Sequence, residues 1–262
     1  MSKIMLTRRK LLVTGAVGAS SLVLGGCDTF DFLSQNDSRA RAVLEKANNL
    51  TYHAQRLLIR NGALAPEYSE TEIRQGQRPN GSTDPQTNEY VTLKDNGFAD
   101  YRLAVTGLVE RPRNYSLAEL QNMPSRTQIT RHDCVEGWSC IAKWTGTPLS
   151  RILDEVGLKP NARYVVFHCY DKYDDNAGAV PYYESCDLID ARHPQTILAY
   201  GLNGESLPVA NGAPIRVRIE RALGYKQPKY VHTIELVDSF AHMGRGKGGF
   251  WEDLGYDWYA GI

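Results

Sequence analysis

Short stretches rich in β-branched and aromatic residues recur through the middle of the chain and restrict the fold more than any other feature. The first places Tyr101, Leu103 and Val105 alternately with polar or small residues and ends at Gly107, which is the period-two pattern of a strand. Similar stretches follow at residues 128–130, 164–170, 215–219 and 230–237. This series predicts a domain built largely from short strands.

Two short helices are predicted between these strands. Ser116 and Glu119 have the S-x-x-E spacing of a capping box, which predicts a helix over residues 117–123. We expect Thr147 to cap a second helix, which begins at the following proline and ends at Gly157. The predicted fold class is therefore α+β, rich in β-structure and organised as a single domain.

The first 26 residues have the layout of a bacterial export signal. They contain four basic residues and no acidic one, with Arg8 and Arg9 side by side, and an apolar stretch over residues 11–24 follows. The arginine pair resembles a twin-arginine signal, which a receptor reads for export of folded proteins. The stretch is too short and too rich in glycine for a permanent membrane-spanning helix. We therefore expect residues 46–262 to form the folded domain.

Residues 24–27 resemble a lipobox, the site at which a lipoprotein signal is cleaved. Cleavage would leave Cys27 as a lipidated amino terminus on the outer face of a membrane, with residues 27–45 as a tether. In lipoproteins of this kind an aspartate at the next position favours the inner membrane, and Asp28 stands there. The predicted location is the periplasm, anchored to the inner membrane. The alternative is an ordinary cleaved signal followed by a chance cysteine.

Charge gives no reason to expect nucleic acid as a partner. Removal of residues 1–26 takes four of the 30 basic residues and none of the 30 acidic ones, which leaves 26 against 30, a formal charge of minus four. Aromatic residues are concentrated near the carboxyl end, between Phe250 and Tyr259. We expect that segment to pack onto the domain as a cover.

Four cysteines remain after Cys27. They are Cys134, Cys140, Cys169 and Cys186, and an oxidising compartment would allow two disulfides among them, including a local bridge between the first two. No spacing is CxxC, so a structural zinc site is weakly supported. The sequence also has no CxxCH haem-attachment motif and no glycine-rich dinucleotide fingerprint.

Three blocks of sequence, in order and at compatible spacing, resemble the sulfite oxidase family of molybdopterin-dependent oxidoreductases. The first block runs from Tyr101 to Pro124, and the second is the stretch from Arg131 to Ser139 around Cys134. The third covers residues 211–216 and 224–229. The resemblance is greatest to the bacterial branch, which includes the periplasmic methionine-sulfoxide reductase catalytic subunits. It implies a β-rich molybdopterin-binding fold with Mo-molybdopterin as the cofactor.

The resemblance also implies roles for individual residues. Cys134 would be the protein ligand to the metal, since a thiolate is a soft, strongly donating ligand. Arg131 would favour that thiolate or attract an anionic substrate, although a surface salt bridge is the simpler interpretation. The residues implied to bind the cofactor are Cys169, Asn211, Arg216, Gln227, Pro228 and Lys229, with Arg78 and Asn80 in a stretch that partly matches the family's Arg-Asn-His run.

The implied activity is oxygen-atom transfer on a small sulfur-containing substrate, either sulfite oxidation or reduction of a sulfoxide of the methionine type. Electrons would pass through a separate carrier, a membrane haem protein or a soluble cytochrome. Because the chain stops soon after the third block, without the carboxy-terminal domain through which sulfite oxidases dimerise, a monomer is expected.

Two other classes of function are compatible with parts of the sequence. A non-catalytic periplasmic binding lipoprotein would share the signal, the tether and the β-rich core. A thiol or zinc hydrolase would use Cys134 as a nucleophile beside a base such as His132. The metal content of the purified protein separates the three classes. Molybdenum would indicate the oxidoreductase, zinc the hydrolase, and neither metal the binding lipoprotein.

Overall fold

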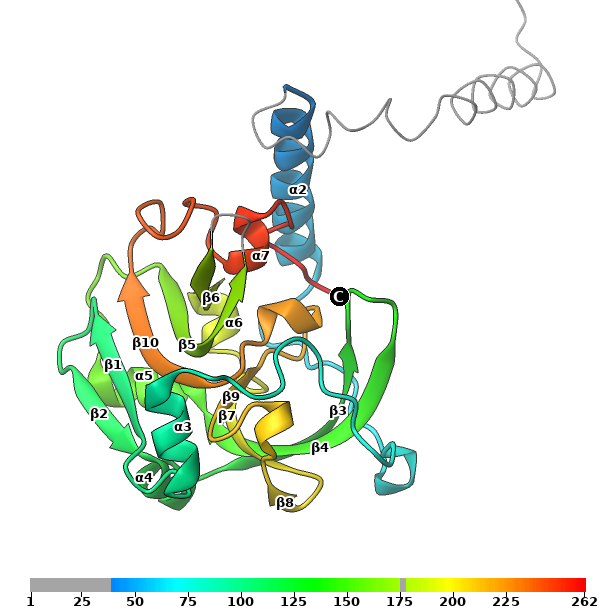
Figure 1. Cartoon of the computed structure of the whole chain (residues 1–262). Coiled ribbons are helices and arrows are strands. Elements are labelled where there is room, and N and C mark those ends of the chain that lie inside the picture. The colour runs from blue at the N-terminus through cyan, green and yellow to red at the C-terminus, as the bar shows by residue number, and fades with distance from the viewer. Residues whose placement is uncertain (1–38, 175–177) are drawn as a thin grey trace, which may run out of the picture. The chain divides into compact units, whose positions relative to one another are not determined.

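The computed structural model describes residues 39–174 and 178–262 (Figure 1). The predicted export signal, Cys27 and most of the predicted tether lie outside the described residues. The chain divides into two units, residues 1–50 and residues 51–262. The described part of the first unit is the beginning of helix α2 (Arg39–Leu58). Within the described ranges, no helix is both long enough and apolar enough to cross a membrane.

Two five-stranded sheets form the frame of the second unit as far as the structure describes it. The first sheet has the strand order β2-β1-β10-β5-β6. Its strands are β1 (Arg102–Gly107), β2 (Arg113–Ser116), β5 (Tyr164–Asp174), β6 (Ala179–Asp187) and β10 (Val231–Val237). β1 and β10 run parallel, with Val105 opposite Ile234, and the other neighbours are antiparallel.

The second sheet has the order β3-β4-β7-β8, and β9 also pairs with β7. Its strands are β3 (Arg126–Asp133), β4 (Ser139–Pro148), β7 (Ile197–Leu202), β8 (Glu205–Ser206) and β9 (Arg216–Arg218). β3 and β4 form a long antiparallel hairpin (Figure 1), and the turn that joins them, residues 134–138, contains Cys134. This sheet therefore supports the predicted metal ligand.

Short helices and turns connect the strands. They are η2 (Glu70–Glu72), α3 (Asn88–Asp95), α4 (Leu117–Asn122), α5 (Leu149–Val156), α6 (Leu188–Ala191), η3 (Val209–Asn211), η4 (Gly224–Lys226) and α7 (Phe250–Asp253). The β-rich α+β fold predicted from the sequence is confirmed.

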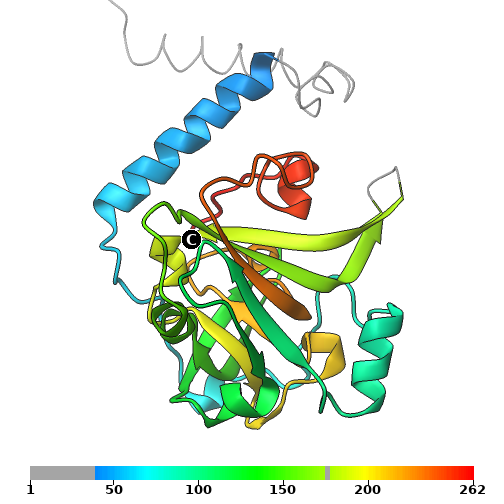
Figure 2. The same cartoon turned by 90° about the vertical axis from the view of Figure 1, so that its left-hand side faces the viewer.

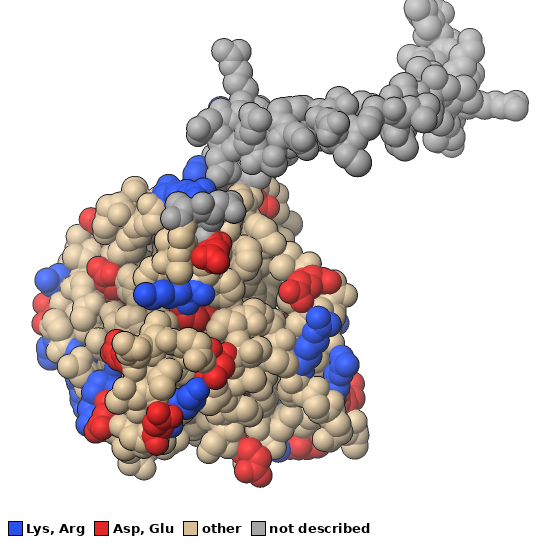
Figure 3. All heavy atoms as spheres, viewed as in Figure 1, with Lys and Arg blue, Asp and Glu red and all other residues tan. Residues whose placement is uncertain are grey.

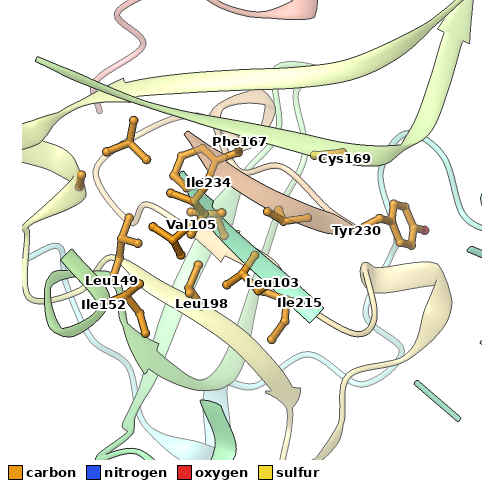
Figure 4. Close-up of a cluster of buried hydrophobic side chains, with 14 of the residues drawn as sticks. Leu103, Val105, Leu149, Ile152, Phe167, Cys169, Leu198, Ile215, Tyr230 and Ile234 are labelled. Carbon is orange, nitrogen blue, oxygen red and sulfur yellow. The ribbon is translucent and has the colours of Figure 1, made fainter. Parts of the chain in front are cut away.

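The main hydrophobic core lies between the two sheets and α5 (Figure 4). Leu103 and Val105 of β1, Phe167 of β5 and Ile234 of β10 are each fully buried. Leu149 and Ile152 of α5, Leu198 of β7 and Ile215 belong to the same cluster. The alternation seen in β1 arises because one face of that strand is turned into this core.

Most of the predicted elements are present, with two differences. The strand expected at 128–130 is longer, because β3 continues through residues 131–133, whose backbone pairs with β4. Thr147 does not cap α5: its buried hydroxyl donates to the carbonyl oxygen of Leu120 at 2.7 Å, and Pro148 occupies the capping position. The capping box of Ser116 and Glu119 forms as expected.

The carboxy-terminal segment packs on β6 through α7, as Figures 1 and 2 both show. Phe250 is buried, and its ring lies 5.8 Å from that of Tyr182 on β6. Trp258 Nε1 donates to the hydroxyl of Ser185 at 2.9 Å. The expectation that the aromatic tail covers the domain is confirmed.

Candidate functional site

A tight turn between β3 and β4 presents Cys134. The backbone N–H of Cys134 donates to the carbonyl oxygen of Trp138 at 2.9 Å, and the N–H of Gly137 donates to the carbonyl oxygen of Cys134 at 3.0 Å. Gly137 has φ of +84°, which glycine adopts without steric cost. The Cys134 side chain is nearly buried, and burial raises the pKa of its thiol. Coordination to a metal would remove that proton.

Cys134 lies in the wall of a cleft that contains about 650 Å³ of space, including the part open to solvent. Segments far apart in sequence form its walls. The lining residues are Asn80, Gly81, Cys134, Val135, Glu136, Asp171, Tyr173, Tyr182, Gly224, Tyr225, Gln227, Pro228, Lys229, Trp251 and Tyr256. The fold thus brings five of the predicted site residues together, namely Cys134, Asn80, Gln227, Pro228 and Lys229.

Lys229 contributes a buried cation to this cleft. Its ammonium donates to the carbonyl oxygens of Asn80 at 2.6 Å, Ala210 at 3.2 Å and Ser82. Burial, followed by the positive charge of Arg216, lowers the pKa of Lys229 to about 7. Bound anionic groups would stabilise the charged form of this lysine.

Asp171 at the far end of β5 is a second buried charged residue in the cleft wall. Its Oδ1 has no hydrogen-bond partner among the described residues, and burial raises the pKa of its carboxyl to about 7, against the opposing effect of Lys229. Asp171 was not among the predicted site residues. An aspartate directly after the largely apolar and aromatic residues 164–170 was the available signal.

Arg216 and Asn211 lie behind the cleft wall. The Arg216 guanidinium donates to the carbonyl oxygen of Asn211 at 3.0 Å and to that of Gln227 at 3.4 Å, and it lies over the Trp144 ring at 4.9 Å. Burial, followed by Arg218, lowers the pKa of Arg216 to about 9. No carboxylate forms a salt bridge with Arg216 within the described ranges. This leaves a buried positive charge next to the cleft.

A buried polar cluster beneath the Cys134 turn was also missed from the sequence. The Arg218 guanidinium donates to Glu220 at 3.0 and 2.7 Å and lies 2.9 Å from Nδ1 of His132. Gln128 Nε2 donates to the same glutamate at 2.8 Å. The signal for this cluster was the alternation of Arg216, Arg218 and Glu220 with valine and isoleucine, which places all three charges on one face of a strand.

The remaining predicted residues do not line the cleft. Arg131 is exposed and forms a salt bridge with Asp133 at 2.8 Å. Arg78 lies at the rim, over the Trp138 ring at 5.0 Å and 3.8 Å from a carboxylate oxygen of Glu136. Cys169 is buried in the main core. Their roles in the cofactor site stay predictions.

All four cysteines in the described ranges carry free thiols: Cys134, Cys140, Cys169 and Cys186. The described residues contain no cluster of three or more His, Cys, Asp or Glu side chains arranged to hold a metal ion. No hydrogen bond in the described ranges joins the Cys134 thiol to the His132 ring, whose Nδ1 faces Arg218. This arrangement does not support a cysteine–histidine nucleophile.

The residues in and behind the cleft fit a molybdopterin. The Cys134 thiol supplies one soft ligand, and the buried cations Lys229 and Arg216 suit the phosphate at the end of the cofactor. Asp171 Oδ1 is a buried acceptor without a partner among the described residues. A pterin presents N–H donors of the kind that such acceptors require.

Fold and site together define an oxidoreductase with a molybdopterin-binding domain. The family described as "Oxidoreductase molybdopterin binding domain" matches residues 90–243, more than half of the 262-residue chain, and the chain belongs to this family. The family and the Mo-molybdopterin cofactor predicted from the sequence are confirmed, and the chain is an enzyme of this class.

The similar proteins include two curated relatives with related names. A provisionally assigned protein-methionine-sulfoxide reductase subunit, YedZ1 of Azospira oryzae, is 36% identical over 245 residues, which cover 94% of this chain and 84% of the relative. The protein-methionine-sulfoxide reductase catalytic subunit MsrP of Ralstonia nicotianae is 36% identical over 145 residues, which cover 53% of this chain and 44% of the relative. Among solved structures, the sulfane dehydrogenase SoxCD from Paracoccus pantotrophus matches with a TM-score of 0.47 and 24% identity, over 54% of this chain and 39% of that chain.

Proposed function

We propose that this protein transfers an oxygen atom at sulfur and that it works as a reductase of methionine-type sulfoxides. The observation that carries the proposal is that Cys134 and Lys229 line one cleft with Gln227 and Asn80. The bound molybdopterin would supply a metal that exchanges one oxygen atom and two electrons with the substrate. A sulfoxide takes up two electrons and two protons and yields a thioether and water. The names of the two curated relatives support this substrate class.

The residues divide into two roles. Cys134 would be the protein ligand, and Lys229 and Arg216 would hold the anionic end of the cofactor, while Gln227 and Asn80 position its polar edge. The aromatic side chains of Trp251 and Tyr256 stack at 5.4 Å in the wall of the same cleft. Aromatic rings contact sulfur favourably, so this wall suits the apolar part of a thioether or sulfoxide.

The charges in the cleft favour a neutral sulfoxide over sulfite. Lys229 is the only cation among the described lining residues. Its ammonium donates hydrogen bonds to three carbonyl oxygens. Glu136 and Asp171 line the cleft as well. A dianion at the metal would therefore lie near the Glu136 carboxylate, while Lys229 and Arg216 are engaged by the anionic end of the cofactor.

The experiment uses full-length protein from a host that makes molybdopterin, beside Cys134→Ala and the matched control Cys140→Ala. Cys140 is a buried thiol on the neighbouring strand that does not line the cleft. We expect stoichiometric molybdenum in the wild type and the control, and its loss in Cys134→Ala. The wild type should reduce methionine sulfoxide with a reduced dye as electron donor, without oxidising sulfite. If the wild type oxidises sulfite faster than it reduces methionine sulfoxide, the proposed direction of the reaction is wrong.

We also propose that the protein is exported by a twin-arginine signal and anchored through Cys27 on the periplasmic face of the inner membrane. The order of basic residues, apolar stretch and lipobox in residues 1–27 supports this location. Electrons would come from a separate carrier, a membrane haem protein or a soluble cytochrome. The description of one relative as a catalytic subunit agrees with a separate partner. The protein itself would be a monomer that binds no nucleic acid. On the face shown in Figure 3, acidic and basic side chains are interspersed.

A further inference from the structure

Among the buried side-chain atoms that lack a hydrogen-bond partner in the described residues, two belong to side chains that contact the same turn of the cleft wall. They are Nε2 of His132 and Oε1 of Gln227, and both side chains are almost completely buried, at 3% exposed each. Unsatisfied buried polar atoms are uncommon, because each one costs the hydration it has lost. Two of them on neighbouring side chains indicate a contact that the protein is built to make.

The tautomer of His132 is fixed by Arg218. Nη1 of Arg218 lies 2.9 Å from Nδ1 of His132, and a guanidinium can only donate, so Nδ1 must be the acceptor. The proton of the neutral ring is then on Nε2. Arg218 is itself fixed, because Glu220 accepts two of its hydrogen bonds in the fully buried interior. His132 therefore offers a donor at Nε2.

The orientation of the Gln227 amide is fixed independently. Its Nε2 donates to the carbonyl oxygens of Ile219 at 3.1 Å and Ala222 at 2.9 Å. A flipped amide would place its oxygen against both carbonyls, so the assignment of nitrogen and oxygen follows from the contacts. Gln227 therefore offers an acceptor at Oε1.

The donor and the acceptor lie on either side of one turn. A Cβ on Gly224 would stand 2.5 Å from both Cε1 and Nε2 of His132, so the ring edge lies directly against this glycine. Gln227 ends the same turn, η4, and its N–H donates to the carbonyl oxygen of Gly224 at 3.1 Å. The side chain of Gln227 also interacts with the His132 ring.

We infer that His132 is a positioning residue whose Nε2–H donates to Oε1 of Gln227 in the cofactor-loaded protein, and so holds the η4 turn against the cleft. The chain from Gln227 to Lys229, which lines the cleft, follows this turn directly. Through His132, the buried Arg218–Glu220 pair would fix the position of that segment relative to Cys134. The inference rests on the proposed function only in that molybdopterin occupies this cleft.

Two substitutions at one position separate the hydrogen bond from the space that the ring fills. His132→Asn keeps an acceptor for Arg218 near the Nδ1 position but has no atom that reaches Gln227. His132→Gln restores a donor near the Nε2 position. Loss of an outer hydrogen bond of this kind typically weakens cofactor binding by about 10–100-fold. We expect the affinity of His132→Asn for the cofactor to be weaker by a factor in that range, so that this variant loses molybdenum and pterin during dialysis. His132→Gln should retain both nearly as well as wild type.

Nitrogen-15 NMR of histidine-labelled holoprotein gives a readout that needs neither activity nor a variant at position 132. We expect His132 to carry its proton on Nε2, with slow exchange against water. In Gln227→Met, which keeps the side-chain length but removes the acceptor, the exchange of that proton should accelerate. A ring protonated on Nδ1, or an Nε2 proton whose exchange is the same in Gln227→Met, would overturn the inference.

The outcomes are distinguishable from those of the proposed function. Equal cofactor retention by His132→Asn and His132→Gln would show that the ring only fills space. Equal loss of thermal stability in the cofactor-free forms, without a difference in retention, would lead to the same conclusion. Wild-type protein that retains molybdenum but reduces no sulfoxide would contradict the proposed substrate and leave the role of His132 intact.

Discussion

The Lys226 ammonium lies 2.5 Å from Oε1 of Glu184, and Glu252 contacts the same ammonium. All three side chains are buried, and they come from η4, β6 and α7. Burial, followed by the neighbouring charge of Glu252, raises the pKa of Glu184. This ion cluster joins the carboxy-terminal segment to the sheet beside the cleft.

Lys226→Met should therefore be strongly destabilising. It would leave two buried carboxylates facing each other, and removal of one partner from a buried ion pair costs about 3–5 kcal/mol. Urea unfolding followed by circular dichroism measures the change. The matched control is Lys159→Met at an exposed position, where a change within about 0.5 kcal/mol is expected. Equal effects of the two variants would contradict the structural role of the cluster.

Gly224→Ala should lower both stability and cofactor content. The new methyl group would meet the His132 ring edge at 2.5 Å, and the ring cannot move away because it is buried. Overpacking of this kind costs about 1–3 kcal/mol. Gly62→Ala is the control, since a Cβ there meets no atom within 4 Å. Thermal melting and molybdenum analysis test both variants, and a normal cofactor content in Gly224→Ala would count against the placement of the turn.

Lys229→Met should weaken cofactor retention by about 10–100-fold. The substitution removes a buried cation from the cleft and releases the carbonyl oxygens of Asn80, Ser82 and Ala210. Lys229→Arg should not restore retention, because a planar guanidinium does not replace an ammonium held by three converging carbonyl groups. Pterin released after dialysis, measured by its fluorescence, gives the comparison. Full retention by Lys229→Met would place the anionic end of the cofactor elsewhere.

Asp171 should make the stability of the cofactor-free protein depend on pH. Burial raises the pKa of its carboxyl from 3.8 to about 7, so the folded state keeps a proton that the unfolded state releases. The free energy of unfolding should fall by on the order of 4 kcal/mol as the pH rises from about 4 to about 7. Lys229 affects the free energy of unfolding in a separate pH window, between about 7 and 10.5. Because its pKa is lowered in the folded state, that free energy should rise with pH across this window.

Asp171→Asn should flatten this dependence, as measured by urea unfolding at a series of pH values. Asp174→Asn, at an exposed position of the same strand, should leave it unchanged. A slope that survives in Asp171→Asn would show that another group titrates.

Cys27→Ser should release the protein from the membrane fraction into the soluble periplasmic fraction, because the lipid is expected to be the anchor. Cell fractionation with an antibody against the domain measures this distribution. If the variant stays with the membrane, the lipoprotein proposal fails, while export itself is judged from Arg8→Lys with Arg9→Lys, which should accumulate in the cytoplasm.

Local signals in the sequence predicted the helices and strands better than they predicted the site. The capping box of Ser116 and Glu119 acts within four residues, so its helix forms as expected. The resemblance around Cys134 identified the family. The burial of Arg216 and Arg218 was not predicted. An arginine in a strand is usually solvated, and the alternation with valine and isoleucine does not show that tertiary packing covers both faces of β9. Asp171 in β5 was missed because an aspartate is usually solvated as well, and its burial depends on packing from distant parts of the chain.

The parallel pairing of β1 with β10 determines when the protein can finish folding. Val105 meets Ile234 in that pair, so the first sheet cannot close until β10 has been synthesised, 129 residues after Val105. Contacts so distant in sequence form slowly, because the long intervening chain must first be brought together. The cleft walls at Asn80, Cys134 and Trp251 come together only after the last of them has left the ribosome. The complete cofactor cleft is therefore available only after residue 251 has emerged, and not while the segments before it are being synthesised.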